Sequence, residues 1–217
     1  MMTESLLELI RKDFPMVRMT MAGRFRGIRD WEKLGYALTD AQLEAFPKIP
    51  WDDEVLTSPC PFFPDKAVSQ THDFFLGRPE SLVSLNTLFP ELFIRSDSEA
   101  WHLDEREEFA SKISSLSWHL ALCLPSSIFA GKSYDEQLRL LPEGYRPMSA
   151  VDEVMRHLLF KPSFGESSEE LGSCNNCSDI TSDGKIVKVC LTKKGVSIGR
   201  YPVYPTRTTT LAIEREP

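Results

Sequence analysis

An abrupt change of composition near residue 161 constrains the fold of this chain more than any other feature. Residues 162–183 are rich in Ser, Gly and Asn, and they contain five acidic residues but no Lys or Arg. Between residues 184 and 213 the chain then carries six Lys and Arg residues and no acidic one. Polar stretches of this kind are typical of boundaries between structural units. We therefore predict a body over residues 1–161, an acidic polar hinge over residues 162–183, and a small basic β module over residues 184–217.

The predicted body is mainly helical, and its longest helix is expected over residues 104–124. Phe109, Ile113, Leu116 and Leu120 follow helical spacing there, and Pro125 ends the pattern. Acidic residues crowd the first turns, where negative charge is favourable against the helix dipole.

Shorter helices are predicted from their capping residues and apolar spacing. Thr39 and Ser133 begin capping-box patterns, and Ser149 precedes an apolar stripe that must end before Pro162. Two further helices are expected over residues 3–13 and 79–89. Residues 47–64 combine prolines with Trp and Phe. Because proline disfavours regular strand pairing while aromatic rings favour burial, we predict an ordered loop packed across the core.

The C-terminal module is predicted to be a small antiparallel sheet. Residues 186–191, 196–198 and 208–213 are rich in β-branched residues and are separated by turn signals. The predicted fold class is therefore α+β, a mainly helical N-terminal body followed by this β module.

The composition limits which classes of protein this chain can belong to. The net charge is −7 and 41% of the 217 residues are hydrophobic, which fits a soluble protein with a real core. No apolar run approaches the roughly 20 residues that span a bilayer, and the first residues do not resemble a signal peptide. An odd number of cysteines, five, favours free thiols in a reducing cytoplasm.

Three cysteines in the last third of the chain suggest a metal site. Cys174 and Cys177 have zinc-knuckle spacing, and Cys190 lies just downstream. A closed zinc site needs a fourth ligand, which a distant histidine would have to supply. The alternative interpretation is two unpaired turn thiols beside a buried strand cysteine, so zinc is a possible cofactor and not a required one.

The basic module also predicts a contact surface, formed by Lys193, Lys194, Arg200, Tyr201 and Tyr204. Basic residues interleaved with aromatic rings are typical of surfaces that bind single-stranded nucleic acid. The alternative is a solvated sheet edge on which lysines discourage association. Another protein is the preferred partner, nucleic acid is the alternative, and a membrane is excluded.

Catalysis has weak support in the sequence. The chain contains no Gly-x-Ser-x-Gly, His-Glu-x-x-His or phosphate-binding glycine loop. His119 is interpreted as a core histidine of the long helix, and His157 as a surface partner of Glu153. Cys60 and His72 are the residues on which a metal-dependent hydrolase would be built.

Three segments together resemble a family of uncharacterised bacterial proteins. They are residues 49–63, which begin with an Ile-Pro motif, residues 134–142 around a Glu-Gln pair, and residues 178–184, a Ser-Asp segment ending in Gly. The resemblance covers roughly residues 47–213. It implies a central helix at the Glu-Gln pair and a C-terminal β module suited to a displayed recognition surface, and it brings no catalytic residue. This chain carries Tyr201 and Tyr204 where that family has a Trp-Asp-Asp segment.

Taken together, these patterns predict a non-enzymatic recognition or protein-interaction protein that uses the basic module. The alternatives are a nucleic-acid-binding accessory protein and a metal-dependent hydrolase.

Overall fold

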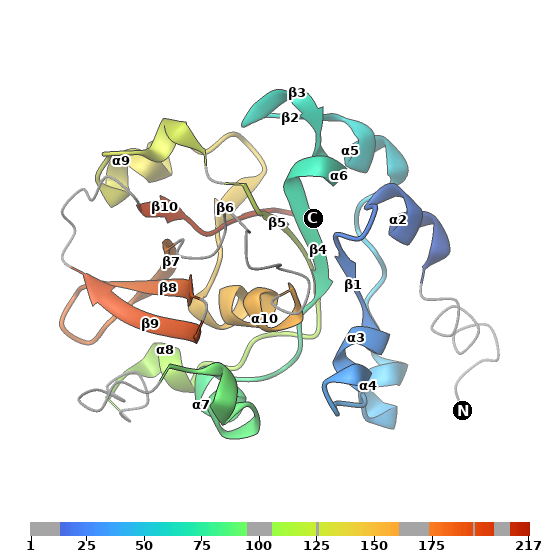
Figure 1. The fold of residues 1–217 in the computed structure, drawn as a ribbon, viewed down its shortest axis with the longest axis horizontal. Coiled ribbons are helices and arrows are strands. Elements are labelled where there is room, and N and C mark those ends of the chain that lie inside the picture. Colours follow the sequence, from blue (N-terminus) through green and yellow to red (C-terminus); the bar gives the residue numbers. More distant parts are fainter. Residues whose placement is uncertain (1–13, 95–105, 125, 161–173, 193, 202–208) are drawn as a thin grey trace.

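The structure is a mixed α/β protein in which two sheets enclose one buried helix (Figure 1). The computed structural model describes residues 14–94, 106–124, 126–160, 174–192, 194–201 and 209–217. It contains about 36% helix and 28% strand, distributed over sheets of five, four and two strands. The expectation of a mainly helical body is therefore wrong, because the body contributes strands to the largest sheet.

The five-stranded sheet draws its strands from both ends of the chain. Its order is β1-β4-β5-β11-β6, with β1 parallel to β4 and the remaining pairs antiparallel. β4 and β5 lie at the centre, and every residue of both is buried. The strands are β1 (Phe25–Arg26), β4 (His72–Leu76), β5 (Trp118–Leu122), β6 (Tyr145–Pro147) and β11 (Ile213–Arg215).

The long helix predicted over residues 104–124 is wrong. Within the described part of that segment, only α8 (Glu108–Ser111) is helical, and β5 follows from Trp118. Ile113, which the helical pattern placed on the apolar face, is 67% exposed. The sequence Trp-His-Leu-Ala-Leu of β5 is a short apolar run buried on both faces, and periodicity alone does not distinguish such a run from a helix.

The four-stranded sheet has the order β10-β7-β8-β9. Its strands are β7 (Cys174–Ile180), β8 (Ile186–Thr192), β9 (Gly195–Tyr201) and β10 (Thr209–Leu211). The first two predicted module strands are confirmed as β8 and β9. The third predicted strand, residues 208–213, is divided between two strands: β10 joins this sheet, while β11 joins the five-stranded sheet. Residues 174–180 of the predicted hinge form β7, and residues 162–173 lie outside the described ones.

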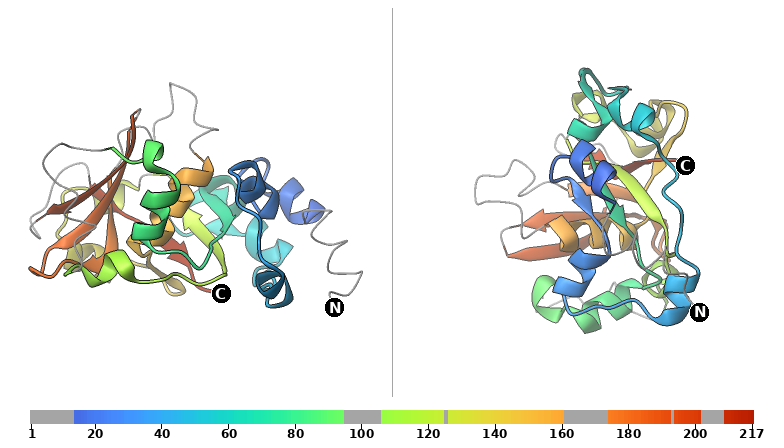
Figure 2. Two further views of the ribbon diagram at one scale, coloured as in Figure 1. Left: turned by 90° about the horizontal axis from the view of Figure 1, so that it is seen from below. Right: turned by 90° about the vertical axis from the view of Figure 1, so that its right-hand side faces the viewer.

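Helix α10 (Ala150–Phe160) fills the space between the two sheets (Figure 2). All of its residues are buried, including Asp152, Glu153, Arg156 and His157. Its start after Ser149 confirms the predicted cap, since Ser149 Oγ accepts a hydrogen bond from the Asp152 N–H at 3.2 Å. A helix buried all round requires partners for its charged side chains, and these partners shape the candidate site.

The opposite face of the five-stranded sheet is covered by the N-terminal helices (Figure 1). Phe25, Phe74 and Trp118 form an aromatic cluster there, with ring centroids 5.2–5.5 Å apart. Trp51 packs on Phe74 at 5.5 Å and is 5% exposed, and Phe62 is 8% exposed, so the predicted burial is confirmed for these two aromatic residues of the Pro-rich segment. Its expected lack of strand pairing is wrong, because β2 (Pro59–Cys60) pairs with β3 (Phe63–Ala67).

The remaining helices are short, and local capping explains where several begin. Thr39 and Ser133 cap helices as predicted, and a helix within residues 79–89 is confirmed as α7. The predicted helix over residues 3–13 lies outside the described residues. These helices are α2 (Pro15–Thr20), α3 (Ile28–Lys33), α4 (Asp40–Glu44), α5 (Asp53–Thr57), α6 (Val68–Thr71), α7 (Leu82–Leu88) and α9 (Tyr134–Arg139), with 3-10 turns η1 (Pro90–Leu92) and η3 (Ser127–Phe129).

Both larger sheets share one hydrophobic core. It contains Phe74 and Leu120 from the five-stranded sheet, Val187 and Ile198 from the four-stranded sheet, and most of α10. Because residues before 161 and after 183 belong to the same core, the predicted body and module are coupled energetically. No described helix combines the length and apolar character needed to cross a bilayer.

Candidate functional site

Three of the five residues predicted to form a basic contact surface are described by the structure, and they lie in β9 or just before it. Lys194 precedes β9 and its backbone N–H donates to Thr192 Oγ1 at 3.1 Å. Tyr201 is the last residue of β9. Lys193 and Tyr204 lie outside the described residues. The backbone therefore brings Lys194, Arg200 and Tyr201 to one edge strand.

An acidic residue of the predicted hinge, Asp183, lies against this basic edge. Asp183 Oδ2 lies 2.7 Å from Lys185 Nζ and 3.7 Å from Arg200 Nη1. Hydrogen bonds from Lys185 and Thr181 lower the pKa of Asp183 to about 2, so its charge persists. Lys188 is only 5% exposed, and burial lowers its pKa. The edge is therefore less basic than its sequence indicates.

The three cysteines proposed as zinc ligands do not form a common ligand set. Cys174 and Cys190 stand opposite each other on β7 and β8 and are joined by a disulfide. Cys177 is fully buried, and burial together with nearby Glu153 raises the pKa of its thiol well above the ordinary value. The expectation of free thiols is wrong at Cys174 and Cys190. Across the described part of the chain, no three His, Cys, Asp or Glu side chains gather to hold a metal ion.

Cys60 and His72, the basis of the hydrolase alternative, are sealed inside the protein. They are 1% and 0% exposed, and both border Tyr145, whose ring centroid lies 5.8 Å from that of His72. Burial lowers the pKa of His72 to about 3. A substrate has no access to these groups in this conformation, so we do not place a catalytic centre there.

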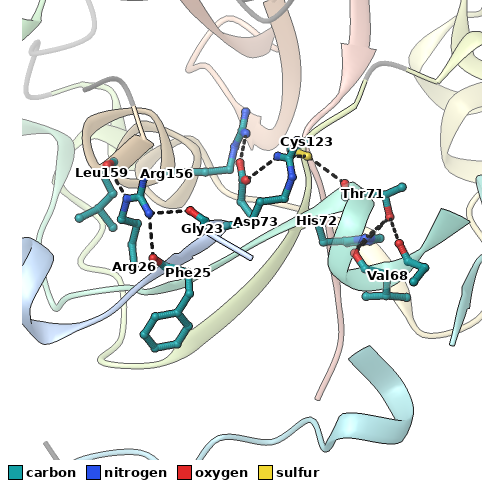
Figure 3. Close-up of polar contacts among 12 residues, drawn as sticks. Gly23, Phe25, Arg26, Val68, Thr71, His72, Asp73, Cys123, Arg156 and Leu159 are labelled. Atoms are coloured by element: carbon teal, nitrogen blue, oxygen red, sulfur yellow. Dashed lines mark hydrogen bonds and ion pairs between the residues drawn. The ribbon is translucent and has the colours of Figure 1, made fainter. Parts of the chain in front are cut away.

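A buried network of charges joins α10 to the five-stranded sheet (Figure 3). Arg156 Nη1 donates to Asp73 Oδ2 on β4 at 2.8 Å, and two further N–H groups of Arg156 bind Glu153 at 2.9 Å each. Arg24 Nη1 donates to Asp73 Oδ1 at 3.1 Å and lies 2.7 Å from Cys123 Sγ. Two guanidinium groups, the buried one of Arg156 and the partly exposed one of Arg24, thus balance two buried carboxylates.

The same network reaches the second sheet through Glu153. Asn175 Nδ2 on β7 donates to Glu153 Oε1 at 2.8 Å. Burial alone would raise the pKa of Glu153, but the charges of Arg156 and the nearby His157 hold it below its ordinary range. The network is therefore a structural clamp between three layers, buried at Asp73, Glu153 and Arg156 and partly exposed at Arg24.

A pocket open to solvent lies at the N-terminal end of α10, where both sheets meet it. Its volume is about 480 Å³. The lining residues come from the segment before β5, from β6, from the start of α10, and from β7 and β11. They are Lys112, Ile113, Ser114, Ser115, Arg146, Pro147, Ser149, Val151, Asp152, Ser178 and Glu214.

His119 lies buried between two carboxylates of this lining. Its Nδ1–H donates to Glu214 Oε2 at 2.6 Å, and its Nε2 lies 3.8 Å from Asp152 Oδ1. The ring stacks on Phe75 with centroids 5.0 Å apart and planes 15° apart. A Cβ on Gly77 would lie 2.5 Å from His119 Nε2, so only glycine leaves room for the ring.

The two carboxylates raise the proton affinity of the histidine. Burial alone would lower the pKa of His119, but the hydrogen bond to Glu214 and the negative charge of Asp152 raise it above the ordinary value. Burial alone would raise the pKa of Glu214, but His119 and Arg146 lower it. A protonated His119 therefore compensates acidic charge beneath the pocket.

The oxygen atoms of both carboxylates already have donors within the protein. Asp152 accepts from the hydroxyls of Ser114 and Ser149, one on each oxygen. Glu214 accepts from His119 on one oxygen and from Arg146 Nε, at 2.8 Å, on the other. Each oxygen of the two carboxylates thus has a donor from the protein itself.

Two cationic side chains extend at the rim of the pocket. The side chain of Arg146 is 53% exposed, and that of Lys112 is 63% exposed, with its Nζ 3.9 Å from Asp179 Oδ1. Guanidinium groups offer five N–H donors in a planar fork that matches a carboxylate. The arrangement favours an acceptor-rich, negatively charged group.

Sequence reasoning missed most of this pocket. The cap formed by Ser149 and Asp152 was visible as a local pattern, but it predicted a helix start only. Arg146 and Glu214 lie directly opposite each other on β6 and β11, 68 residues apart, so no local signal joins them. His119 is a core histidine as expected, but it lies in a strand instead of a helix.

The fold and the pocket together define a mixed α/β protein with a polar site where a central helix begins between two sheets. Comparisons with protein-family models, with curated proteins and with solved structures each found no match. The function is therefore argued from the site alone.

Proposed function

We propose that this chain is a recognition protein that binds a carboxylate group of a protein partner in the pocket at the start of α10. One observation carries the proposal: the pocket's own carboxylates are satisfied internally, while the donors of Arg146 and Lys112 extend at its rim. A partner's Asp or Glu side chain, or its C-terminal carboxylate, supplies further acceptors to these donors, in addition to Glu214 and Asp179.

The size of the pocket fits the recognition of a single chemical group of a partner and not of an extended stretch of its surface. A volume of about 480 Å³ is at the lower end of the range for small-ligand sites. Ser115 and Ser178 add hydroxyl groups to the lining. Charge pairing at a partly exposed site contributes specificity and association rate more than affinity.

The proposal is tested by nuclear magnetic resonance with two matched probes, N-acetylglutamate and its neutral amide, N-acetylglutamine. The acid is expected to shift backbone signals of residues 112–115, 146–149 and 178, with a dissociation constant on the order of millimolar because one group supplies few contacts. Arg146→Gln is expected to abolish these shifts. Arg139→Gln, an exposed arginine on α9, is the control that keeps them.

Equal shifts with both probes would show that the pocket does not select a carboxylate. Changes in the backbone NMR signals centred on residues 194–200 would indicate that the probe binds at the basic edge instead. Either result would overturn the proposal for the pocket.

The edge strand β9 is a second candidate contact site for the same function. It ends the order of the four-stranded sheet; Arg200 lies on it and Lys194 immediately precedes it. Paired substitutions Lys194→Glu and Arg200→Glu would remove binding of a partner that uses this edge. Single-stranded nucleic acid is the competing ligand, and its binding would weaken steeply with salt.

A further inference from the structure

Ser117, His119 and Glu214 are linked in the order that acyl-transfer enzymes use for a nucleophile, a base and an orienting acid. Glu214 Oε2 accepts from His119 Nδ1 at 2.6 Å, and His119 Nε2 lies 3.1 Å from Ser117 Oγ. Both distances fall within or near the hydrogen-bonding range of such triads. Each nitrogen of the imidazole therefore has the partner that the chemistry requires.

We propose that these three residues form an acyl-transfer centre at the edge of the pocket that hydrolyses carboxylic esters. This goes beyond the proposed recognition of a carboxylate and does not depend on it. Ser117 is the nucleophile, His119 the general base and acid, and Glu214 the positioning residue.

The sheet sets the register of the three residues. Ser117 immediately precedes β5 and His119 is the second residue of that strand, and their side chains meet with Ser117 Oγ 3.1 Å from His119 Nε2. Glu214 on β11 pairs with Ala121, two positions beyond His119. Phe75 and Gly77 on the β4 side fix the ring from the other edge. The base is thus held by rigid elements, as an efficient catalytic group requires.

The nucleophile is reachable although the base is not. His119 is 5% exposed, while Ser117 is partly exposed. Ser115, which lines the pocket, has its Oγ 2.9 Å from Ser117 Oγ. Ser117 is not itself a lining residue, so in the proposed reaction an acyl group reaches it past Ser115, whose hydroxyl can donate to the carbonyl oxygen under attack.

The reaction balances without a cofactor. Ser117 Oγ forms a bond to the carbonyl carbon while its proton passes to His119 Nε2. The bond to the leaving alcohol then breaks, and the alcohol takes that proton. Water adds to the acyl-serine and gives a proton to His119 Nε2, and the acid departs as the proton returns to Ser117 Oγ. The products are one carboxylic acid and one alcohol.

The pH dependence follows from the surroundings of the histidine. His119 faces Glu214 on β11, Asp152 on α10, Ser117 just before its own strand, and, beyond Glu214, Arg146 on β6. Because His119 must lose its proton before it can act as a base, the reaction rate rises as pH increases through its raised pKa.

A fluorophosphonate probe, which phosphonylates activated serines, tests the proposal on the whole protein. The expected result is one covalent adduct mapped to Ser117, with a labelling rate that rises with pH. Ser117→Ala is expected to reduce labelling to background. Ser111→Ala, an exposed serine on α8, is the control with unchanged labelling.

A second variant distinguishes a role of Glu214 in catalysis from a role in folding alone. Glu214→Gln is expected to slow labelling and to move the pH midpoint of the rate to lower pH, since His119 loses a charged partner. A purely structural role would not move that midpoint. No adduct on the wild-type protein, or an adduct that survives in Ser117→Ala, would overturn the proposal. Carboxylate binding in Ser117→Ala that matches wild type would leave the recognition proposal standing.

Discussion

Arg156 binds the carboxylate of Glu153 through two hydrogen bonds of 2.9 Å, one helical turn away on a helix whose residues are all buried. The pair does not stand alone, since Arg156 also bonds to Asp73 on the neighbouring sheet. Replacement of one member of such a group leaves an opposite charge buried without compensation. The clamp therefore decides how α10, and with it the pocket, is held between the two sheets.

Arg156→Met is expected to lower the free energy of unfolding by about 3–5 kcal/mol, because Asp73 and Glu153 lose their common partner. Urea unfolding measures the difference. Arg139→Met removes an exposed arginine from α9 and is expected to change stability by less than about 0.5 kcal/mol. Equal effects of the two substitutions would show that the clamp does not contribute to stability.

Gly77→Ala is expected to destabilise the protein by about 1–3 kcal/mol, because the new Cβ would lie 2.5 Å from His119 Nε2. A double-mutant cycle with His119→Ala isolates this contact. In the His119→Ala background most of the cost of Gly77→Ala should vanish, giving a coupling energy on the order of 1–3 kcal/mol. Strictly additive effects would contradict the close approach of ring and backbone.

The disulfide between Cys174 and Cys190 is expected to contribute about 3 kcal/mol, since it closes a loop of 16 residues in the unfolded chain. Reductant should lower the urea midpoint of the wild-type protein by the corresponding amount. The double variant Cys174→Ala, Cys190→Ala should have the lower midpoint with or without reductant. A wild-type protein that does not respond to reductant would contradict the pairing.

In an NMR pH series, the pKa values of His119 and His72 are expected to lie on opposite sides of the ordinary histidine value. His119 should protonate above the ordinary value of 6.5, and His72 only at about 3. The stabilisation from His119 is present below pH 6.5 and is lost as pH rises through its raised pKa. The stabilisation from neutral His72 is present above pH 6.5 and is lost as pH falls toward 3.

Glu214→Gln provides the control for this titration. It should lower the pKa of His119 and leave that of His72 unchanged, because only His119 bonds to Glu214. A His119 that titrates below 6.5 in the wild-type protein would contradict the geometry described for the pocket floor.

Local patterns predicted the helices whose starts depend on neighbouring residues. Thr39, Ser133 and Ser149 cap helices because each side chain bonds to a backbone N–H within three residues. The segment at Trp118–Leu122 was predicted wrongly because its burial comes from β4 and β11, which lie far away in the sequence. Tertiary contacts therefore decided its conformation against the helical spacing.

The candidate site could not be predicted for the same reason. His119 and Glu214 are 95 residues apart, and their contact exists because β11 crosses from the end of the chain into the five-stranded sheet. Cys174 meets Cys190 through strand register, which the Cys-x-x-Cys spacing obscured by suggesting Cys177 as its companion. Composition did indicate a basic strand near the C-terminus, but it did not reveal that Asp183 lies against it.

Site-directed photo-crosslinking tests whether the pocket at the start of α10 contacts a partner protein. A photoreactive amino acid replaces Ser178 in the pocket lining or, in a companion protein, exposed Arg139 on α9. We expect a crosslinked partner from position 178 that disappears when Arg146→Glu is added, and none from position 139. Crosslinking from position 178 that is indifferent to Arg146→Glu, or equally strong crosslinking from position 139, would contradict this expectation.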